Sequence, residues 1–368
     1  MKYGLFTLAA AAVMVTSCGG SKSNANSENA EVAAVTPAQS LITRLDSVAK
    51  SGHYYFGHHD DTAYGHTWKY VDGGSDVKAV TGQYPGLMSW DLGMIEVDSA
   101  KNLDGVPFSF IASEIAKQHA RGGINAISWH ALNPMSGGGS WDVSTAPLRN
   151  LADGEAVSDT MKVWIDRAAA FVASLKDSVG NPIPVIFRPW HENSGSWFWW
   201  GKDHATPEEY ISLWKMTRAG FDARGINNVV WAYSPDKDLT REEYFSTYPG
   251  DEYVDILGTD IYHFDGEAGV NDYVTRIKAQ MLFVVEEAQN RGKIAAFTET
   301  GLEGLSVTDW YTRVFEPAIK GLPIAYVCVW RNAIESEKPN HFYVPYPGHA
   351  SESDFKKFHD ESGAIFVD

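Results

Sequence analysis

Two glutamates in this sequence follow apolar runs that have the length of buried strands. Glu192 comes after the run 184–190, and Glu299 comes after the run 294–298, just before a glycine turn. A pair of facing carboxyl groups can cleave a glycosidic bond, one protonating the leaving oxygen and the other stabilising or attacking the anomeric carbon. A lone glutamate is more often a solvated or salt-bridged group. The candidate site therefore depends on both residues ending strands.

The neighbours of the two glutamates predict different roles for them. Trp190 and Trp197 give Glu192 apolar surroundings, which would raise its pKa and keep it protonated as the general acid. We expect Glu299 to stay ionised as the nucleophile. Arg188 is expected to point inward by strand alternation, where it either orients Glu299 or forms a structural ion pair.

Strands and helices are predicted to alternate along the chain. Eight apolar runs of strand length lie at 54–57, 86–90, 124–129, 184–190, 229–233, 254–261, 294–298 and 324–330. Between them, helical spacing covers 108–121, 159–176, 207–224, 272–291 and 308–320, whereas 65–83 is a poor helix interrupted by Asp72-Gly73-Gly74. The pattern predicts an α/β fold, a single (β/α)8 TIM barrel, with an open doubly wound sheet as the alternative.

The spacing of the two glutamates fits this barrel. They are 107 residues apart, which corresponds to three β/α units of roughly 30 to 35 residues each. We therefore expect Glu192 to end the fourth strand and Glu299 the seventh. Active sites of such barrels lie at the carboxyl ends of the strands, so both side chains should reach one cleft.

Composition excludes some classes of partner. The formal net charge is −17, with 47 acidic and 30 basic residues, so no clustered positive surface for nucleic acid is expected. The thirteen Trp residues suit stacking on pyranose rings, although most Trp side chains fill cores. An uncharged substrate is compatible with this surface.

Three motifs resemble glycoside hydrolase family 26, the β-mannanase family of the retaining (β/α)8 clan. They are RPWHE at 188–192, SWFWWG at 196–201 and TETG at 298–301. His191 is the sharpest of these signals, because most of the clan has Asn before the acid/base glutamate. The resemblance spans roughly Leu41 to the carboxyl end and implies double displacement, with the two carboxyl groups about 5 to 5.5 Å apart.

The same resemblance implies roles for residues at other strand ends. It makes Tyr262 a contact of the nucleophile, Trp197 a wall on the leaving-group side, and Trp330 with Arg331 a platform and clamp on the glycone side. It also makes His130 and His191 sugar contacts. A satisfied core histidine is the alternative for His130, and core packing is the alternative for the aromatic residues.

The implied activity is hydrolysis of β-1,4-mannosidic linkages in mannan, galactomannan or manno-oligosaccharides. Exo-acting release of mannobiose and a non-catalytic sugar-binding lipoprotein are the alternatives. The loop 134–149, with three glycines and Trp141, is a candidate for a wall that would restrict the cleft. Mixed-linkage glucan and xylan stay open as substrates.

A barrel metallohydrolase is the main enzymatic alternative. The residues His58, His59, Asp60 and Asp61, with His66 nearby, could hold a metal ion. Adjacent residues of a strand point to opposite faces, which weakens that hypothesis, and sugar contacts suit His58 and Asp60 better. We expect no metal and no cofactor, since hydrolysis by two carboxyl groups needs neither.

The amino-terminal residues are predicted to form a targeting signal. Residues 1–18 resemble a bacterial lipoprotein signal with Cys18 as the lipidated residue, and an ordinary secretory signal is the alternative. Residues 19–36 read as a flexible linker and 37–368 as the catalytic domain. We expect an exported monomer anchored by lipid alone, facing the periplasm rather than the cell surface. Cys328 is expected to be a buried, inert thiol.

Overall fold

The computed structural model describes residues 34–152 and 154–368. The chain divides into Met1–Ala34 and Val35–Asp368, and the elements described below lie in the second unit. The predicted signal segment, Cys18 and nearly all of the predicted linker lie outside the described residues. Among the described helices, none is long and apolar enough to cross a bilayer. The predicted domain limits stay a prediction.

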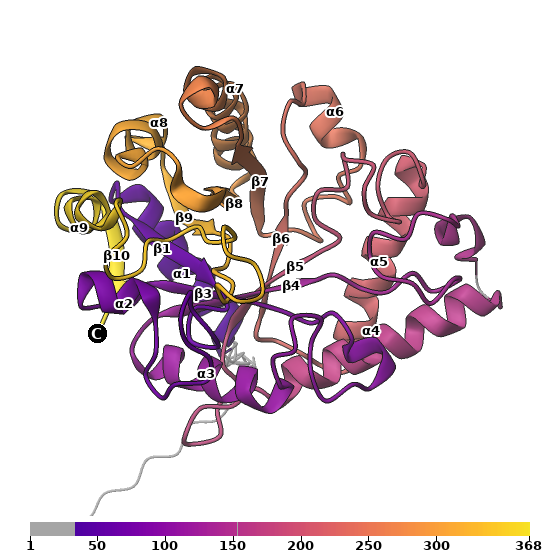
Figure 1. Ribbon diagram of the computed structural model, residues 1–368. Helices are drawn as coiled ribbons and strands as arrows, with labels where there is room; N and C mark the ends of the chain where they lie inside the picture. The colour runs from indigo at the N-terminus through magenta and orange to yellow at the C-terminus, as the bar shows by residue number, and fades with distance from the viewer. Residues whose placement is uncertain (1–33, 153) are drawn as a thin grey trace, which may run out of the picture. The chain divides into compact units, whose positions relative to one another are not determined.

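Eight parallel strands form a closed barrel in the centre of the second unit (Figure 1). β1 pairs with β3 on one side and with β9 on the other, which closes the sheet. The eight strands are β1 (Tyr54–His59), β3 (Leu87–Asp91), β4 (Ile124–Trp129), β5 (Val185–Pro189), β6 (Val229–Tyr233), β7 (Ile256–His263), β8 (Ile294–Leu302) and β9 (Ile324–Val329). The predicted (β/α)8 fold is confirmed, and the doubly wound alternative is wrong.

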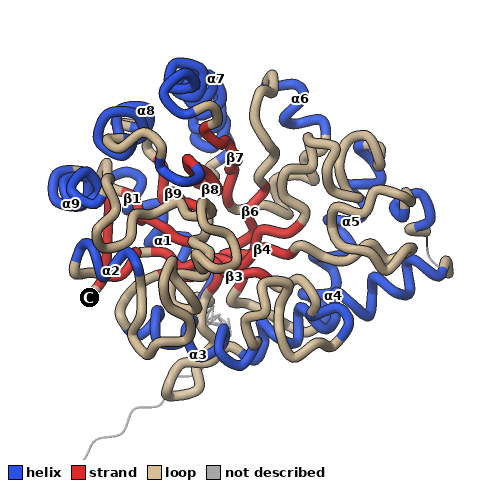
Figure 2. The backbone as a smooth tube through the Cα atoms, in the orientation of Figure 1, coloured by secondary structure: helices blue, strands red, loops and turns tan. Residues whose placement is uncertain are grey.

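Helices surround the strands, as Figure 2 shows in blue around red. The predicted helical segments appear as α3 (Phe108–Ala120), α4 (Ala156–Ser174), α5 (Pro207–Ala223), α7 (Gly266–Arg291) and α8 (Glu316–Ile319), the last preceded by a π-helical segment at Trp310–Phe315. The first crossover keeps only the short α2 (Asp76–Thr81), as its glycine-rich sequence predicts. Three more helices had no predicted counterpart: α1 (Pro37–Lys50), α6 (Arg241–Ser246) and α9 (Glu352–Glu361).

The strands are buried on both faces because they separate two apolar layers. One layer contains residues from all eight barrel strands, among them Ile186, Ala296 and Cys328, so it fills the barrel interior. The other layer, which includes Phe187 and Phe297, lies between the strands and the helices. Neighbouring residues such as Ile186 and Phe187 thus face opposite sides, as the two-residue period of a strand requires. Cys328 is a buried free thiol, as predicted.

Helix α1 packs on the barrel interior at the amino ends of the strands. Its Thr36 cap accepts a hydrogen bond from the Gln39 amide, and proline occupies the first turn. Leu41, Leu45 and Ala49 recur every four residues, so they share one buried face, and they join the interior layer. The opposite ends of the strands remain available for a site.

Two short strands extend the sheet beyond the barrel. β10 (Ala364–Val367) runs parallel to the start of β1, and β2 (Tyr84–Pro85) pairs antiparallel with β10. The carboxyl-terminal segment is therefore fastened to the barrel by main-chain hydrogen bonds next to Phe56, whose ring stacks on Phe366. This end of the chain lies away from the predicted catalytic residues.

Candidate active site

One cavity of about 410 Å³ lies at the carboxyl ends of the barrel strands. Seven of the eight residues predicted for the site line it, and only Arg331 does not. The full lining is His130, Trp141, His191, Glu192, Trp197, Phe198, Asp236, Lys237, Tyr262, Phe264, Glu299, Trp330 and Tyr343. Residues from six barrel strands and their loops therefore meet in one place, as the barrel hypothesis requires.

Glu192 belongs to the turn after β5 and not to the strand itself. β5 ends at Pro189, and both Trp190 and Glu192 have positive φ angles, 54° and 53°. That backbone region is uncommon for residues other than glycine. The Glu192 amide donates to the Ser234 carbonyl at 2.8 Å, and the Trp197 indole N–H donates to the Glu192 carboxylate at 2.8 Å. These contacts aim the carboxyl group into the cavity.

The surroundings of Glu192 favour its protonated form. Burial is the main cause that raises its pKa well above the ordinary value, and the charges of Glu299, Asp260 and Asp236 raise it further. The indole N–H of Trp197 acts in the opposite direction. A carboxyl group whose protonated form is favoured in this way can serve as a general acid.

The predicted contribution of Trp190 to this environment is wrong. Its ring packs against Trp129, Trp199 and Trp200, and its indole N–H donates to Thr217 on α5 at 3.0 Å. The positive φ of Trp190 turns the chain so that adjacent side chains diverge more than strand alternation predicts. Trp190 therefore supports the turn from the core, while the cavity wall comes from Trp197.

Glu299 lies inside β8, three residues before its end, and not at the end as predicted. Both carboxylate oxygens are hydrogen-bonded: Tyr262 donates its hydroxyl to Oε1 at 2.5 Å, and Arg188 donates from Nη2 to Oε2. Arg188 also donates from Nη1 to Asp260 at 2.6 Å. The inward direction predicted for Arg188 is confirmed, and its two proposed roles coincide, because the buried ion pair includes the candidate nucleophile.

A β-bulge directs Glu299 into the cavity. Phe297 is opposite Thr259 of β7, but Glu299 is opposite Asp260, which leaves Thr298 as an extra residue. Strict alternation from the interior residue Ala296 would place Glu299 on the outer face with Phe297. The extra residue reverses the alternation and re-aims the side chain. The Thr298 hydroxyl donates to Asp260 at 2.7 Å.

A buried chain of hydrogen bonds leads from Asp91 to the cavity. His130 Nδ1 lies 2.7 Å from Asp91 Oδ2, and His130 Nε2 lies 3.2 Å from His191 Nε2. Burial lowers the pKa of His130, but the Asp91 charge and hydrogen bond, with the Glu299 charge, outweigh burial and raise it. Burial and the Arg188 charge hold the pKa of His191 well below its ordinary value. These opposite shifts favour a proton on His130 over one on His191, so that His130 Nε2 would be the donor in this contact.

Aromatic side chains form the walls of the cavity. Trp197 and Phe264 are 38% and 53% exposed, and both line the cavity together with Glu192 and Lys237. Lys237 Nζ lies 5.0 Å above the Phe264 ring. Trp330 stacks on His59 with the ring centroids 4.2 Å apart. Exposed aromatic faces of this kind suit the apolar faces of sugar rings.

Arg331 does not line the cavity. Its guanidinium group is 2.9 Å from Asp104 and donates to the Tyr64 hydroxyl at 3.1 Å. Trp330 and Arg331 follow each other directly beyond β9, so they point in different directions. Trp330, the predicted platform, therefore lines the cavity. Arg331, the predicted clamp, belongs instead to a polar cluster with Asp104 and Tyr64.

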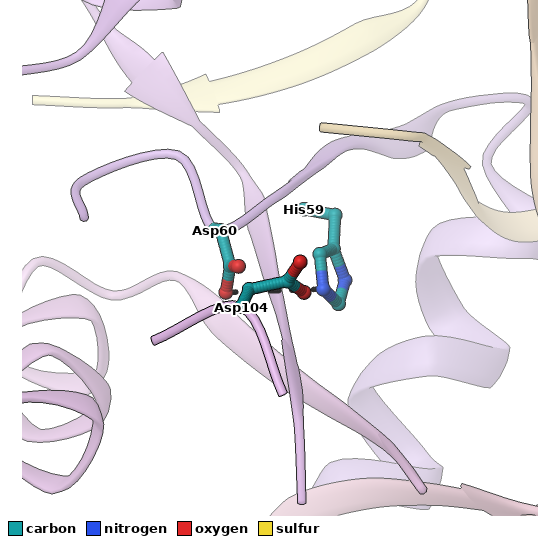
Figure 3. Close-up of side chains that lie close together, drawn as sticks. All are labelled: His59, Asp60 and Asp104. Atoms are coloured by element: carbon teal, nitrogen blue, oxygen red, sulfur yellow. Dashed lines mark ion pairs between the residues drawn. The ribbon is translucent and has the colours of Figure 1, made fainter. Parts of the chain in front are cut away.

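Among the residues that the structure describes, three residues of that cluster have ligand atoms close enough to be considered for a metal (Figure 3). His59, Asp60 and Asp104 place one ligand atom each within 4.8 Å of the others. Burial and the charge of Asp104 raise the pKa of Asp60 to about 8, and the Arg331 guanidinium already pairs with Asp104. Of the predicted metal candidates, His58 is instead paired with Asp61 at 2.7 Å. An arginine and a protonated carboxyl group make this cluster a poor cation site.

Six cavity residues were missing from the predicted site: Trp141, Phe198, Asp236, Lys237, Phe264 and Tyr343. Trp141 was foreseen only as part of a restricting loop, and its ring stacks on His130 with the centroids 5.3 Å apart. Asp236 and Lys237 follow β6, so the rule that functional residues follow strand ends would have found them. Tyr343 lies far beyond β9 in a long loop, and no spacing signal marks it.

A closed (β/α)8 barrel with two glutamates facing one cavity at its carboxyl end defines a class of glycoside hydrolases. The chain belongs to glycosyl hydrolase family 26, whose model matches residues 30–302. A GH26 β-mannanase structure from Bacteroides ovatus is 45% identical, with a TM-score of 0.87 over 90% of this chain and 95% of that chain. An endo-β-1,4-mannanase structure from Cellulomonas fimi is 33% identical, with a TM-score of 0.80 over 90% of this chain and 76% of that chain.

Several sequence relatives bear the name mannan endo-1,4-beta-mannosidase. One from Bifidobacterium adolescentis is 32% identical over 98% of this chain, which spans 37% of the length of that relative. One from Bacillus subtilis is 29% identical over 70% of this chain and 70% of the relative. This protein is therefore an enzyme of the glycoside hydrolase class.

Proposed function

We propose that this enzyme hydrolyses β-1,4-mannosidic bonds within mannan chains by double displacement. The observation that carries the proposal is that two carboxyl groups in one cavity have different surroundings, which favour the protonated form of one and the ionised form of the other. Burial and negative neighbours favour protonated Glu192, whereas Arg188 and Tyr262 donate to both oxygens of Glu299. The names of the relatives supply mannan as the substrate and endo as the mode of action.

In the first step, Glu299 attacks the anomeric carbon while Glu192 protonates the departing oxygen, and a mannosyl-enzyme forms. Formation of that ester removes the Glu299 charge, which is the second largest cause of the raised pKa of Glu192. The pKa of Glu192 then falls, so the same group can accept a proton from water in the second step. Arg188 and Tyr262 stabilise the departing carboxylate when the ester is hydrolysed.

We propose which aromatic wall of the cavity lies on each side of the scissile bond. Trp197, which touches the Glu192 carboxylate, would pack against the leaving group, and Trp330 would pack against the glycone. His130 and His191 also line the cavity and would contact the sugar whose bond is cleaved. Arg331 would contribute only to a sugar bound beyond Trp330, because it does not line the cavity.

Chemical rescue tests the two carboxyl roles separately. Glu299→Ala and Glu192→Ala should each lose reducing-end release from mannan, by at least about 1,000-fold. With azide and an activated mannoside, the first variant should yield the α-azide and the second the β-azide, because only the first lacks the nucleophile. Glu303→Ala, at an exposed residue just beyond Glu299 on the chain, is the matched control and should stay active. The opposite pair of anomers would exchange the roles.

Products and substrates test the remainder of the proposal. Reduced mannohexaose should give a spread of product lengths, whereas mannobiose alone would mean exo action. Xylan and mixed-linkage glucan should be poor substrates. A sequence relative from Acetivibrio thermocellus named endoglucanase H matches 43% of this chain. Preferred cleavage of glucan would therefore contradict mannan as the proposed substrate.

We also propose that the enzyme is exported and anchored through lipid at Cys18, facing the periplasm. The order of charged, apolar and small residues before Cys18 supports this proposal. Cells labelled with a palmitate analogue should incorporate it into the wild type and not into Cys18→Ala. Removal of the protein by protease treatment of intact cells would contradict the periplasmic orientation.

A further inference from the structure

The turn that carries Glu192 has a backbone conformation that its own residues do not favour. Trp190 and Glu192, the first and last residues of this catalytic turn (Trp190–Glu192), both have positive φ angles. Such a backbone costs free energy in residues other than glycine, and it persists only where the surrounding structure fixes it. The groups that hold the catalytic turn therefore help to set the direction of the Glu192 carboxyl group.

Two buried side chains donate hydrogen bonds to carbonyl groups of the catalytic turn. The Tyr210 hydroxyl donates to the Trp190 carbonyl at 2.9 Å, and the Trp200 indole N–H donates to the His191 carbonyl at 2.8 Å. All four residues are at most 2% exposed. A buried carbonyl that loses its donor is destabilised, because water cannot readily replace the donor there. Each donor therefore fixes the orientation of one peptide group of the turn.

Helix α5 contacts Trp190 at two points. In addition to the contact made by Tyr210, the Thr217 hydroxyl accepts a hydrogen bond from the Trp190 indole N–H at 3.0 Å. Tyr210 and Thr217 are seven residues apart, about two helical turns, so they share the buried face of α5. A capping box of Thr206 and Glu209 fixes the first turn of the helix, directly before Tyr210. One helix thus holds both the main chain and the ring of Trp190.

The two α5 residues lie outside the wall of the catalytic cavity. The described lining of that cavity includes neither Tyr210 nor Thr217. Burial raises the pKa of Tyr210 well above its ordinary value, so its hydroxyl keeps its proton and remains a donor. Any effect of Tyr210 on catalysis must therefore act through the main chain of the catalytic turn.

We propose that helix α5 positions the acid/base carboxyl group, and that Tyr210 is the positioning residue. Its hydrogen bond fixes the peptide group between Trp190 and His191, and this peptide group directs the chain that carries Glu192 towards the cleaved bond. A displacement of about 1 Å at a reacting group can cost about 100-fold in rate. The inference rests on the proposed acid/base role of Glu192 and adds a residue on which that role depends.

The leaving group of the substrate decides whether the first step needs Glu192. When reduced mannohexaose is cleaved, the bond from Glu299 to the anomeric carbon forms, the glycosidic C–O bond breaks, and the departing oxygen takes the Glu192 proton. With dinitrophenyl β-mannobioside, the departing oxygen leaves as a stable phenolate and needs no proton. The kcat/KM of both substrates reports this first step, so the ratio of the two values measures proton transfer from Glu192.

Tyr210→Phe removes the hydroxyl and keeps the ring. We expect kcat/KM on mannohexaose to fall about tenfold, and kcat/KM on the dinitrophenyl substrate to change little. Glu192→Ala should show the same selectivity with a larger fall on mannohexaose. The matched control is Tyr244→Phe, because the buried Tyr244 hydroxyl donates to the Gly258 carbonyl at 2.8 Å, outside the catalytic turn. This control should keep the wild-type ratio of the two kcat/KM values.

A second pair of variants tests the contact of α5 with the ring of Trp190. Thr217→Val removes the acceptor of the Trp190 indole N–H with little change of side-chain shape, so it should also lower kcat/KM selectively on mannohexaose. Thr217→Ser keeps the hydroxyl and should retain the wild-type ratio. If Tyr210→Phe does not fold, the two Thr217 variants decide by the same criteria.

The comparison of the two substrates separates positioning from general damage. A fall that is confined to mannohexaose supports the proposal. Equal falls on both substrates would mean that the whole site is disturbed and would overturn it, and so would unchanged values on both. Failure of the proposed function looks different, because Glu192→Ala itself would then show no selectivity between the two substrates.

Discussion

The Tyr262 hydroxyl donates to Glu299 Oε1 at 2.5 Å, on the carboxylate side opposite Arg188. Burial and the charge of Glu299 raise the pKa of Tyr262 well above its ordinary value, so the tyrosine remains a donor at any working pH. The hydrogen bond holds one oxygen of the nucleophile in a fixed direction. This contact must change when the nucleophile becomes an ester and when it is released.

Tyr262→Phe should lower kcat by about 100-fold, the cost of removing one oriented donor from a reacting oxygen. The ring itself remains, so the free energy of unfolding should change little. Steady-state kinetics on mannohexaose together with urea unfolding will separate the two effects. A variant with wild-type kcat would show that the hydrogen bond has no part in catalysis.

Arg188→Met should destabilise the enzyme by about 3 to 5 kcal/mol, because Asp260 and Glu299 would lose their buried partner. The matched control is Arg224→Met, which breaks the exposed pair with Asp166 and should cost less than about 1 kcal/mol. Urea unfolding at neutral pH measures both. Similar losses for the two variants would contradict the burial argument.

The pH profile of kcat/KM should show an alkaline limb set by Glu192, because its protonated form is needed and burial raises its pKa. Asp236→Asn removes one of the charges that raise this pKa, so the limb should move to lower pH. Burial raises the pKa of Asp236 itself to about 6, so its charge acts mainly above that pH. Trp197→Phe removes a donor that lowers the pKa of Glu192, so its limb should move to higher pH.

Asp238→Asn is the control for the charge effect. Asp238 is exposed and has a φ of 63°, which asparagine adopts readily. The Asp238→Asn substitution should not move the alkaline limb of the kcat/KM profile. Shifts of equal size for Asp236→Asn and Asp238→Asn would mean that overall charge, and not the charge beside Glu192, sets the profile.

Asp91→Asn should make His130 lose its proton at lower pH, because the carboxylate is the main group that raises its pKa against burial. The carboxylate accepts hydrogen bonds from the Gly93 amide at 2.6 Å and from the Ser128 hydroxyl at 2.7 Å. Nitrogen-15 NMR of labelled histidines would follow the titration. Activity should fall about 10- to 100-fold. Asp98→Asn, an exposed change in the same loop, should alter neither quantity.

The strands were predictable from the sequence because each is buried on both faces and therefore reads as a continuous apolar run. Helix α1 was less visible, since it lies next to a segment of linker composition, and α6 is only one or two turns long. Strand alternation was sufficient to predict that Arg188 points inward. Alternation failed at Trp190, because nothing in the sequence indicates two non-glycine residues with positive φ around His191.

The predicted site depended on residues that directly follow strands, and the structure brings seven of those eight together. Arg331 was misplaced because neighbouring residues after a strand diverge, and composition does not reveal by how much. Phe264 directly follows β7, so the rule that functional residues follow strand ends would have found it. Tyr343 comes from a loop whose path depends on tertiary contacts, such as its edge-to-face packing with Tyr262. Local patterns carry no information about those contacts.

The extra residue at Thr298 decides which face of β8 the following side chains occupy. If β8 paired regularly with β7, so that Thr298 lay opposite Asp260, the same sequence would turn the Glu299 carboxylate outward among the helices. That chain would still contain the glutamate, but its cavity would lack the nucleophile. In this part of the barrel, strand register specifies the nucleophile as strictly as residue type does.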